Sequence, residues 1–164
     1  MFEKALQYKH WSDQRIFSAV QQVDRGQHEP QLQFALQQLN HMTIVEELFK
    51  ARLLGAPAPH ESTNTAAIPQ LQQLEQRNAV SNRWFQGYAA ELNADERDTA
   101  VVFQFADGQA GCLTRREILF HIINHGTYHR GAIGHALDLA GGLRPADTYT
   151  AYIHEVDPSR RQRC

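Results

Sequence analysis

Apolar side chains recur at three- and four-residue steps in four long stretches of the chain, each bounded by glycine or proline. This spacing places an apolar stripe on one side of an α-helix, and a stripe must be buried against another element. The helices are expected at residues 2–23, 30–55, 69–92 and 114–140. Four such helices in 164 residues predict one all-α domain, an antiparallel four-helix bundle.

Local signals mark several helix ends. Pro30 suits a first helical turn, where its missing N–H costs nothing, and Gly55 suits a helix stop. Thr114 and Glu117 have the spacing of a capping box, which predicts that the fourth long helix begins there. Gly141 follows the expected end of that helix.

A short β-hairpin is expected before the fourth long helix. Apolar residues alternate with others over residues 101–105, and Asp107-Gly108 is a turn signal, so the hairpin should reach about Leu113. A short terminal helix is expected within residues 147–156. The bundle domain is therefore expected to span residues 1–158, followed by a basic tail over residues 159–164.

Composition excludes several classes of protein. The chain has 16 basic and 18 acidic residues and no long run of one sign, which argues against nucleic-acid and membrane-surface partners. Apolar runs are too short to cross a bilayer and the first residues are not signal-like, so a cytoplasmic location is expected. The two cysteines, Cys112 and Cys164, exclude a disulfide framework and a Cys-x-x-Cys site.

Histidines are in surplus, and three of the nine stand at steps of four in the fourth helix. A step of four turns a helix by only about 40° from alignment, so His125 and His129 project from one face. That face also carries Ile118 and Ile122, which predicts that both imidazoles point inward. Adjacent buried imidazoles compete for hydrogen-bond partners, whereas a metal ion satisfies both. The alternative is that they are polar packing residues.

A third ligand should come from a facing helix. His41 is the best candidate, because Phe34, Val45 and Leu48 surround it at helical steps. His121 is about 80° around the helix from His129 and is expected to be a neighbour or a surface residue, not a ligand. The remaining histidines are weaker candidates: His10, His28, His60, His135 and His154.

Other metal chemistries lack their residues. Position 126 is glycine, which rules out the His-Glu-x-x-His general base. No paired Glu-x-x-His motifs support a di-iron centre, and Glu46 and Glu47 are expected to face away from His41. A base would have to come from Tyr8, Asp13, Tyr128 or a metal-bound hydroxide.

Several residues leave two interpretations open. Arg130 either binds an anionic substrate group or forms a salt bridge. Trp11 and Trp84 either line a pocket above the metal or pack in the core. Glycines within the fourth helix disfavour it, so a ligand or another part of the chain should approach the backbone closely at Gly126, Gly131 and Gly134.

The run Asn124-His125-Gly126-Thr127-Tyr128-His129-Arg130-Gly131 resembles the DinB/YfiT-like family of four-helix metalloproteins. Trp11 and Arg15 in the first helix, and Leu39-Asn40-His41 before Leu53-Leu54-Gly55 in the second, extend this resemblance to nearly the whole chain. It implies a homodimer and a divalent metal, zinc or nickel before iron. It also maps the ligands onto His41, His125 and His129.

The resemblance carries less information about activity. Characterised relatives include thiol-dependent transferases and isomerases, and three imidazoles leave positions for water or a thiolate. The preferred function is a metal-dependent thiol S-transferase or hydrolase acting on a small molecule, with Arg130 and Tyr128 as candidate catalytic residues. The alternative is a non-catalytic metal-binding or stress-response interaction protein.

Overall fold

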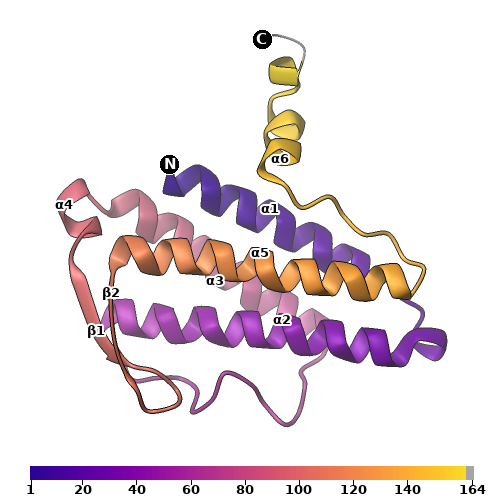
Figure 1. Cartoon of the computed structure of the whole chain (residues 1–164), viewed down its shortest axis with the longest axis horizontal. Helices are drawn as coiled ribbons and strands as arrows, with labels where there is room; N and C mark the ends of the chain where they lie inside the picture. The colour runs from indigo at the N-terminus through magenta and orange to yellow at the C-terminus, as the bar shows by residue number, and fades with distance from the viewer. Residues whose placement is uncertain (162–164) are drawn as a thin grey trace.

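The computed structural model describes residues 1–161. Within them, four long helices confirm the expected helical bundle: α1 (Phe2–Gln21), α2 (Arg25–Leu54), α3 (Leu71–Glu91) and α5 (Arg115–Leu139) (Figure 1). The smaller elements are α4 (Ala94–Arg97), β1 (Ala100–Gln104), β2 (Ala110–Thr114), α6 (Tyr149–Val156) and the 3-10 turn η1 (Pro158–Arg161). Residues 162–164 of the expected basic tail lie outside the described residues.

The order of the helices around the bundle differs from their order in the chain. Both α1 and α2 pack against α3 and α5, so α1 and α2 lie diagonally across the bundle. Helices α1 and α5 run one way, and α2 and α3 run the other (Figure 1). The loop over residues 55–70 therefore runs back along the bundle before α3 begins. This order places α2 and α5, which carry the candidate metal ligands, side by side.

Two apolar clusters fill the bundle, one toward each end. The first includes Ile16, Leu39 and Ile133, and the second includes Leu6, Phe49, Phe85, Ile118 and Ile122. Between them along α1 lie two buried charged side chains, Lys9 and Asp13. The middle of the bundle is therefore polar, and this polar layer lies at the level where the histidines are found.

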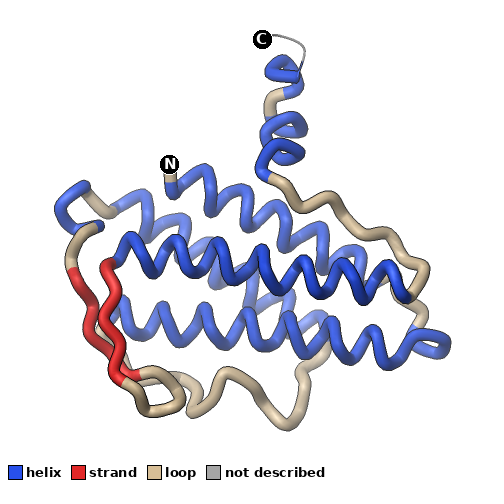
Figure 2. Tube along the Cα trace, viewed as in Figure 1, coloured by secondary structure: helices blue, strands red, loops and turns tan. Residues whose placement is uncertain are grey.

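The hairpin closes one end of the bundle (Figure 2). Strands β1 and β2 pair antiparallel from Ala100 opposite Thr114 to Gln104 opposite Ala110, and Gly108 takes φ 86° in the connecting turn. The predicted capping box is present: Thr114 Oγ1 accepts from the Glu117 N–H, and the Glu117 carboxylate accepts from the Thr114 N–H. Both predictions are confirmed.

Some predicted details were wrong. The long part of helix α2 begins beside Pro30 as predicted, but Asp24 caps an additional turn from Arg25 that was not predicted, by accepting from the Gly26 N–H at 2.8 Å. A break at His28 separates that turn from the rest of the helix. Phe34, expected on the buried face near His41, is 41% exposed. The single turn of α4 had not been predicted; a capping box at its start accounts for it.

The chain after α5 returns along α1. Residues 142–148 form an extended segment, and α6 then packs Tyr152 and Ile153 against Tyr8 and Trp11 before projecting from the bundle (Figures 1 and 2). Across residues 1–161, the structure contains no helix long and apolar enough to cross a membrane.

Candidate metal centre

Three histidines converge between α2 and α5. One ring nitrogen from each of His41, His125 and His129 lies within 4.8 Å of the other two. The Nε2 atom of His125 is 3.1 Å from that of His41 and 3.0 Å from that of His129. All three side chains are half-buried. The structure thus brings together the three residues selected from the sequence, and we call them the three-histidine group.

The opposite ring nitrogens of His41 and His129 are held by acceptors. His41 Nδ1 donates to the Thr63 carbonyl at 3.0 Å, and His129 Nδ1 donates to Gln38 Oε1 at 2.6 Å. Because these oxygens accept, Nδ1 carries the proton and Nε2 presents its lone pair to the centre of the group. Partners of this kind fix the tautomer and orientation of metal-binding histidines.

Thr63 and Gln38 were not found by sequence reasoning. Gln38 precedes His41 by three residues on α2, so helical spacing could have indicated it. Thr63 lies in the loop after α2, where no periodicity applies. That loop is tied to α2 beside His41, because Asn40 Nδ2 donates to Thr65 Oγ1 at 2.7 Å.

The nitrogen positions fit a bound cation. Because Nδ1 carries the proton in His41 and His129, the Nε2 atoms of both present lone pairs to His125 Nε2. His125 Nε2 can donate only one proton, so one lone pair is left without a donor unless a cation binds there. An ion bonded to three nitrogens at about 2.0–2.1 Å separates them by about 2.9–3.4 Å, which matches the two short distances. The donor set therefore suits a divalent metal with imidazole ligands.

Burial keeps the imidazoles of His125 and His129 neutral. It lowers the pKa of His125 to about 3, and the neighbouring histidines contribute to the same shift. Burial, with a further contribution from His41, lowers the pKa of His129 to about 4. Neutral imidazole is the form that binds metal, so both side chains are ready to ligate at neutral pH.

Two further aromatic residues adjoin the group. The His121 ring lies 5.1 Å from the His125 ring and 4.9 Å from that of Phe49, outside the three-histidine group. Tyr128 is 73% exposed and sets its ring edge-on to His129 at 5.0 Å. Tyr128 is thus the candidate base that contacts a member of the group.

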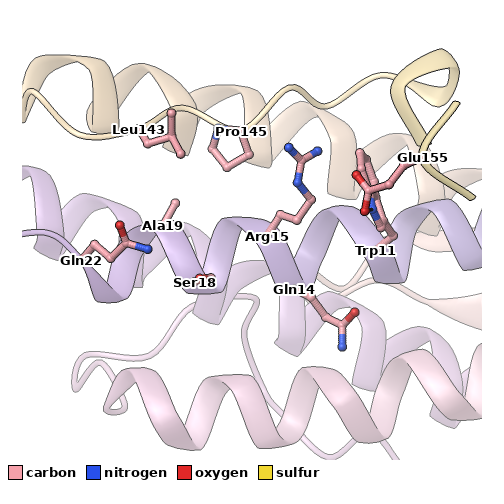
Figure 3. A pocket seen from close by; sticks show the side chains of 9 residues that line it. All are labelled: Trp11, Gln14, Arg15, Ser18, Ala19, Gln22, Leu143, Pro145 and Glu155. Atoms are coloured by element: carbon pink, nitrogen blue, oxygen red, sulfur yellow. Dashed lines mark hydrogen bonds between the residues drawn. The ribbon is translucent and has the colours of Figure 1, made fainter.

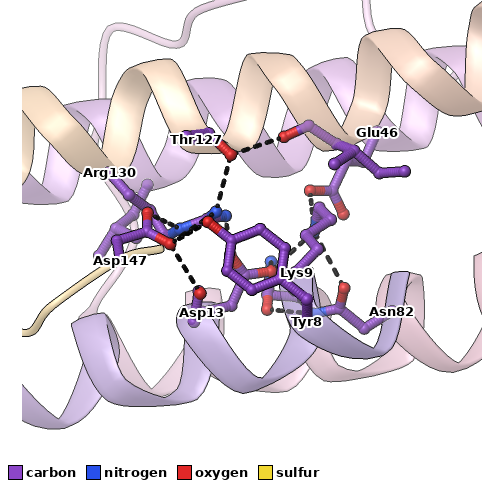
Figure 4. A network of polar contacts seen from close by, with 12 residues as sticks. Tyr8, Lys9, Asp13, Glu46, Asn82, Thr127, Arg130 and Asp147 are labelled. Carbon is purple, nitrogen blue, oxygen red and sulfur yellow. Dashed lines mark hydrogen bonds and ion pairs between the residues drawn. The ribbon is translucent and has the colours of Figure 1, made fainter. Parts of the chain in front are cut away.

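Next to the group lies the polar layer of buried charges (Figure 4). Lys9 Nζ is 2.7 Å from carboxylate oxygens of both Asp13 and Glu46, and Arg130 Nη1 is 2.7 Å from the second oxygen of Asp13. Asn82 adds a bond to Asp13 at 2.9 Å. Glu46 is therefore directed into the bundle, where it pairs with Lys9 and lies outside the three-histidine group.

Burial and ion pairing together determine the pKa shifts of the buried groups in this layer. Burial by itself would raise the pKa of Asp13, but Lys9 and Arg130 outweigh it and lower the pKa to about 2. Burial would lower the pKa of Lys9, but Asp13 and Glu46 raise it instead. For Glu46, burial raises the pKa and Lys9 offsets only part of that rise.

Arg130 is held by the protein's own carboxylates. It is 2% exposed, and its Nε donates to Asp147 at 2.8 Å while Nη1 binds Asp13. Tyr8 also donates to Asp147, at 2.6 Å. A substrate anion would have to displace two carboxylates to reach Arg130, which favours the salt-bridge interpretation. Tyr8 and Asp13, two candidate bases, are engaged in the same network.

Trp11 lies on the outer side of α1, beside a cavity of about 370 Å³ (Figure 3). Its Nε1 donates to Glu155 at 2.9 Å, and Arg15 stacks over its ring while donating to the Ala146 carbonyl. Trp84 stacks on Tyr88. For both tryptophans, these contacts favour the interpretation as packing residues.

Two of the three α5 glycines meet close neighbours. A Cβ at Gly126 would lie 2.8 Å from Arg130 Nη1, and one at Gly134 would lie 2.8 Å from Arg144 Nε. A Cβ at Gly131 would meet nothing within 4 Å. The prediction of close approach is therefore confirmed at Gly126 and Gly134, whereas at Gly131 no other part of residues 1–161 comes close.

Fold and site together define a four-helix bundle with three histidines converging between its second and last long helices. The chain belongs to the DinB family, whose sequence profile matches residues 1–161. It is 24% identical over 165 residues to Protein DinB of Bacillus subtilis (strain 168), with 92% of each chain covered. No solved structure matches the chain.

Proposed function

We propose that the chain binds one divalent metal ion through the Nε2 atoms of His41, His125 and His129. The observation that carries this proposal is the convergence of three Nε2 atoms, with the Nδ1 partners of His41 and His129 directing two of the lone pairs inward. Zinc and nickel are the first candidates and iron is the next, because imidazole suits all three.

We further propose that the protein is a metal-dependent enzyme, of the thiol S-transferase or hydrolase type, acting on a small molecule. A metal held by three imidazoles would lower the pKa of a bound water or thiol. The half-buried ligands and the exposed Tyr128 beside them support an accessible site. The proposal includes a cytoplasmic location and no nucleic-acid or membrane partner, as expected from composition.

Elemental analysis tests the metal site. Protein expressed without a polyhistidine tag should contain about one metal ion per chain, and His41→Ala and His129→Ala should each lose it. His135→Ala changes an exposed histidine of the same helix and should retain the metal. Absence of metal, or its retention by both ligand variants, would contradict the assignment.

Turnover tests the enzymatic part separately. The metal-loaded protein is assayed with a panel of low-molecular-weight thiols plus electrophiles, and with small hydrolysable esters and amides. A rate above that of His125→Ala supports an enzyme. A rate equal to that of the variant throughout the panel supports a non-catalytic metal-binding protein instead.

We also propose a homodimer. An exposed apolar surface between α2 and α5 supports it, where Phe34, 41% exposed, and Leu139, 62% exposed, line the same hollow. Light scattering at micromolar concentrations should give twice the chain mass of 18.7 kDa. A mass of one chain would refute the dimer.

A further inference from the structure

A second cavity lies between the end of α2, the hairpin and the segment after α2. Its volume is about 420 Å³, in the range of small-molecule sites. Its lining is apolar and polar in nearly equal parts, and the apolar part includes Leu48, Val102, Phe103 and Phe105. Small residues, Gly55, Ala56 and Ala58, line the side formed by the loop and leave room there. We call this space the Arg52 cavity, after its one arginine.

Arg52 is held among aromatic rings. Its guanidinium carbon lies 4.6 Å from the ring centre of Phe49, 4.5 Å from that of Phe103 and 5.4 Å from that of Phe105. Its Nη2 donates to the Gln104 carbonyl at 3.1 Å. The rings fix the plane of the guanidinium, and the single hydrogen bond leaves most of its five N–H groups available.

The charge of Arg52 is not balanced by the protein. Within residues 1–161, it forms no ion pair with a carboxylate; Arg77 and Arg130 each form one, and Arg15 and Arg97 form none. Partial burial lowers the pKa of Arg52, and no paired carboxylate offsets that effect. A partly desolvated cation at a cavity wall is a feature of ligand sites.

The surroundings indicate which anion fits. The cavity supplies one arginine, and Glu61 also lines it, so the local charge suits a monoanion better than a dianion. A planar carboxylate matches the guanidinium fork through two parallel hydrogen bonds. The apolar part of the lining suits a hydrocarbon body attached to that carboxylate.

We propose that the Arg52 cavity binds small organic carboxylates, with the carboxylate on Arg52 and the apolar body between the hairpin and α2. This goes beyond the proposed function, because none of the lining residues belongs to the three-histidine group. The site is expected to bind its ligand with or without metal.

Titration of the full ¹⁵N-labelled chain with hexanoate and with hexanamide tests the charge requirement. The two probes have the same shape, and only hexanoate carries the carboxylate. Hexanoate should bind at least about tenfold more tightly, with amide shifts at Gly55, Phe103 and Ala106. Equal affinities, or shifts confined to other parts of the chain, would overturn the proposal.

Variants test the role of Arg52 itself. Arg52→Met keeps the apolar stem among the rings and should weaken hexanoate binding at least about tenfold, while Arg52→Lys should restore part of it. Arg116→Met, which changes an exposed arginine paired with Asp98, should bind hexanoate as the wild type does. Tighter binding of hexyl phosphate than of hexanoate would overturn the assignment to carboxylates.

Discussion

Replacing Asp13 with asparagine removes one negative charge from the polar layer while keeping the shape of the side chain. Asp13 is fully buried and accepts from Lys9 and Arg130, each at 2.7 Å. The variant leaves Lys9 with Glu46 and Arg130 with Asp147, so two buried cations share two carboxylates in place of three. Loss of one partner from a buried ion pair costs about 3–5 kcal/mol.

The pH dependence of this loss follows from the Asp13 pKa. Its folded value of about 2 lies below the ordinary 3.8, which corresponds to about 2–3 kcal/mol of stability at neutral pH. A depressed pKa contributes stability that is present above 3.8 and is lost as the pH falls toward 2. The wild type should therefore lose this contribution between about pH 5 and pH 2, whereas Asp13→Asn lacks it throughout.

Urea unfolding of both proteins, in chelator and at a series of pH values, measures the difference in free energy of unfolding. Subtraction of the two free energies removes the titration of shared groups that are remote from Asp13, such as Glu117. The difference should be about 3–5 kcal/mol at pH 7 and should shrink by about 2–3 kcal/mol toward pH 2. Asp138→Asn, which breaks an exposed pair with Arg144, should cost under about 1 kcal/mol. A difference that does not vary with pH would refute this reasoning.

Three further predictions concern the metal and α5. Chelation should lower the melting temperature of the wild type and leave that of His125→Ala unchanged, as thermal scans would show. Gln38→Leu removes the acceptor of His129 Nδ1 and should weaken metal binding about 10- to 100-fold. Gln37→Leu, at the exposed neighbouring position, should leave metal binding unchanged. Competition with a chromogenic chelator measures both affinities. Gly126→Ala should lower the free energy of unfolding by about 1–3 kcal/mol, because the added Cβ meets Arg130. Gly131→Ala places its Cβ in open space and should raise the free energy of unfolding by up to about 1 kcal/mol. Urea unfolding measures both.

Periodicity predicted the elements that depend on local sequence. The helices, the turn at Gly108 and the cap at Thr114 follow from spacing within a few residues, and the structure confirms them. The histidines were accessible to the same reasoning because His125 and His129 share one helix face. The structure confirms that these side chains meet His41, while the metal itself stays a prediction.

The polar layer was beyond this reasoning, because its charges come from separate helices. Asp13 and Arg130 are 117 positions apart, and no periodicity relates them. One signal was present: Lys9 and Asp13 stand on the same side of α1 as Leu6, Ile16 and Phe17, all of them buried. Charged residues on a stripe that is otherwise apolar could have been read as buried partners of each other.

The polar layer and the three-histidine group occupy the same level of the bundle, and α5 belongs to both. Apolar packing tolerates small rotations of a helix, whereas ion pairs at 2.7 Å do not. We infer that Asp13, by holding Arg130, fixes the rotation of α5 that turns His125 and His129 toward His41. A folded Asp13→Asn variant should therefore bind metal more weakly in the chelator competition, although Asp13 contacts none of the ligands. Unchanged affinity would mean that the polar layer serves stability alone.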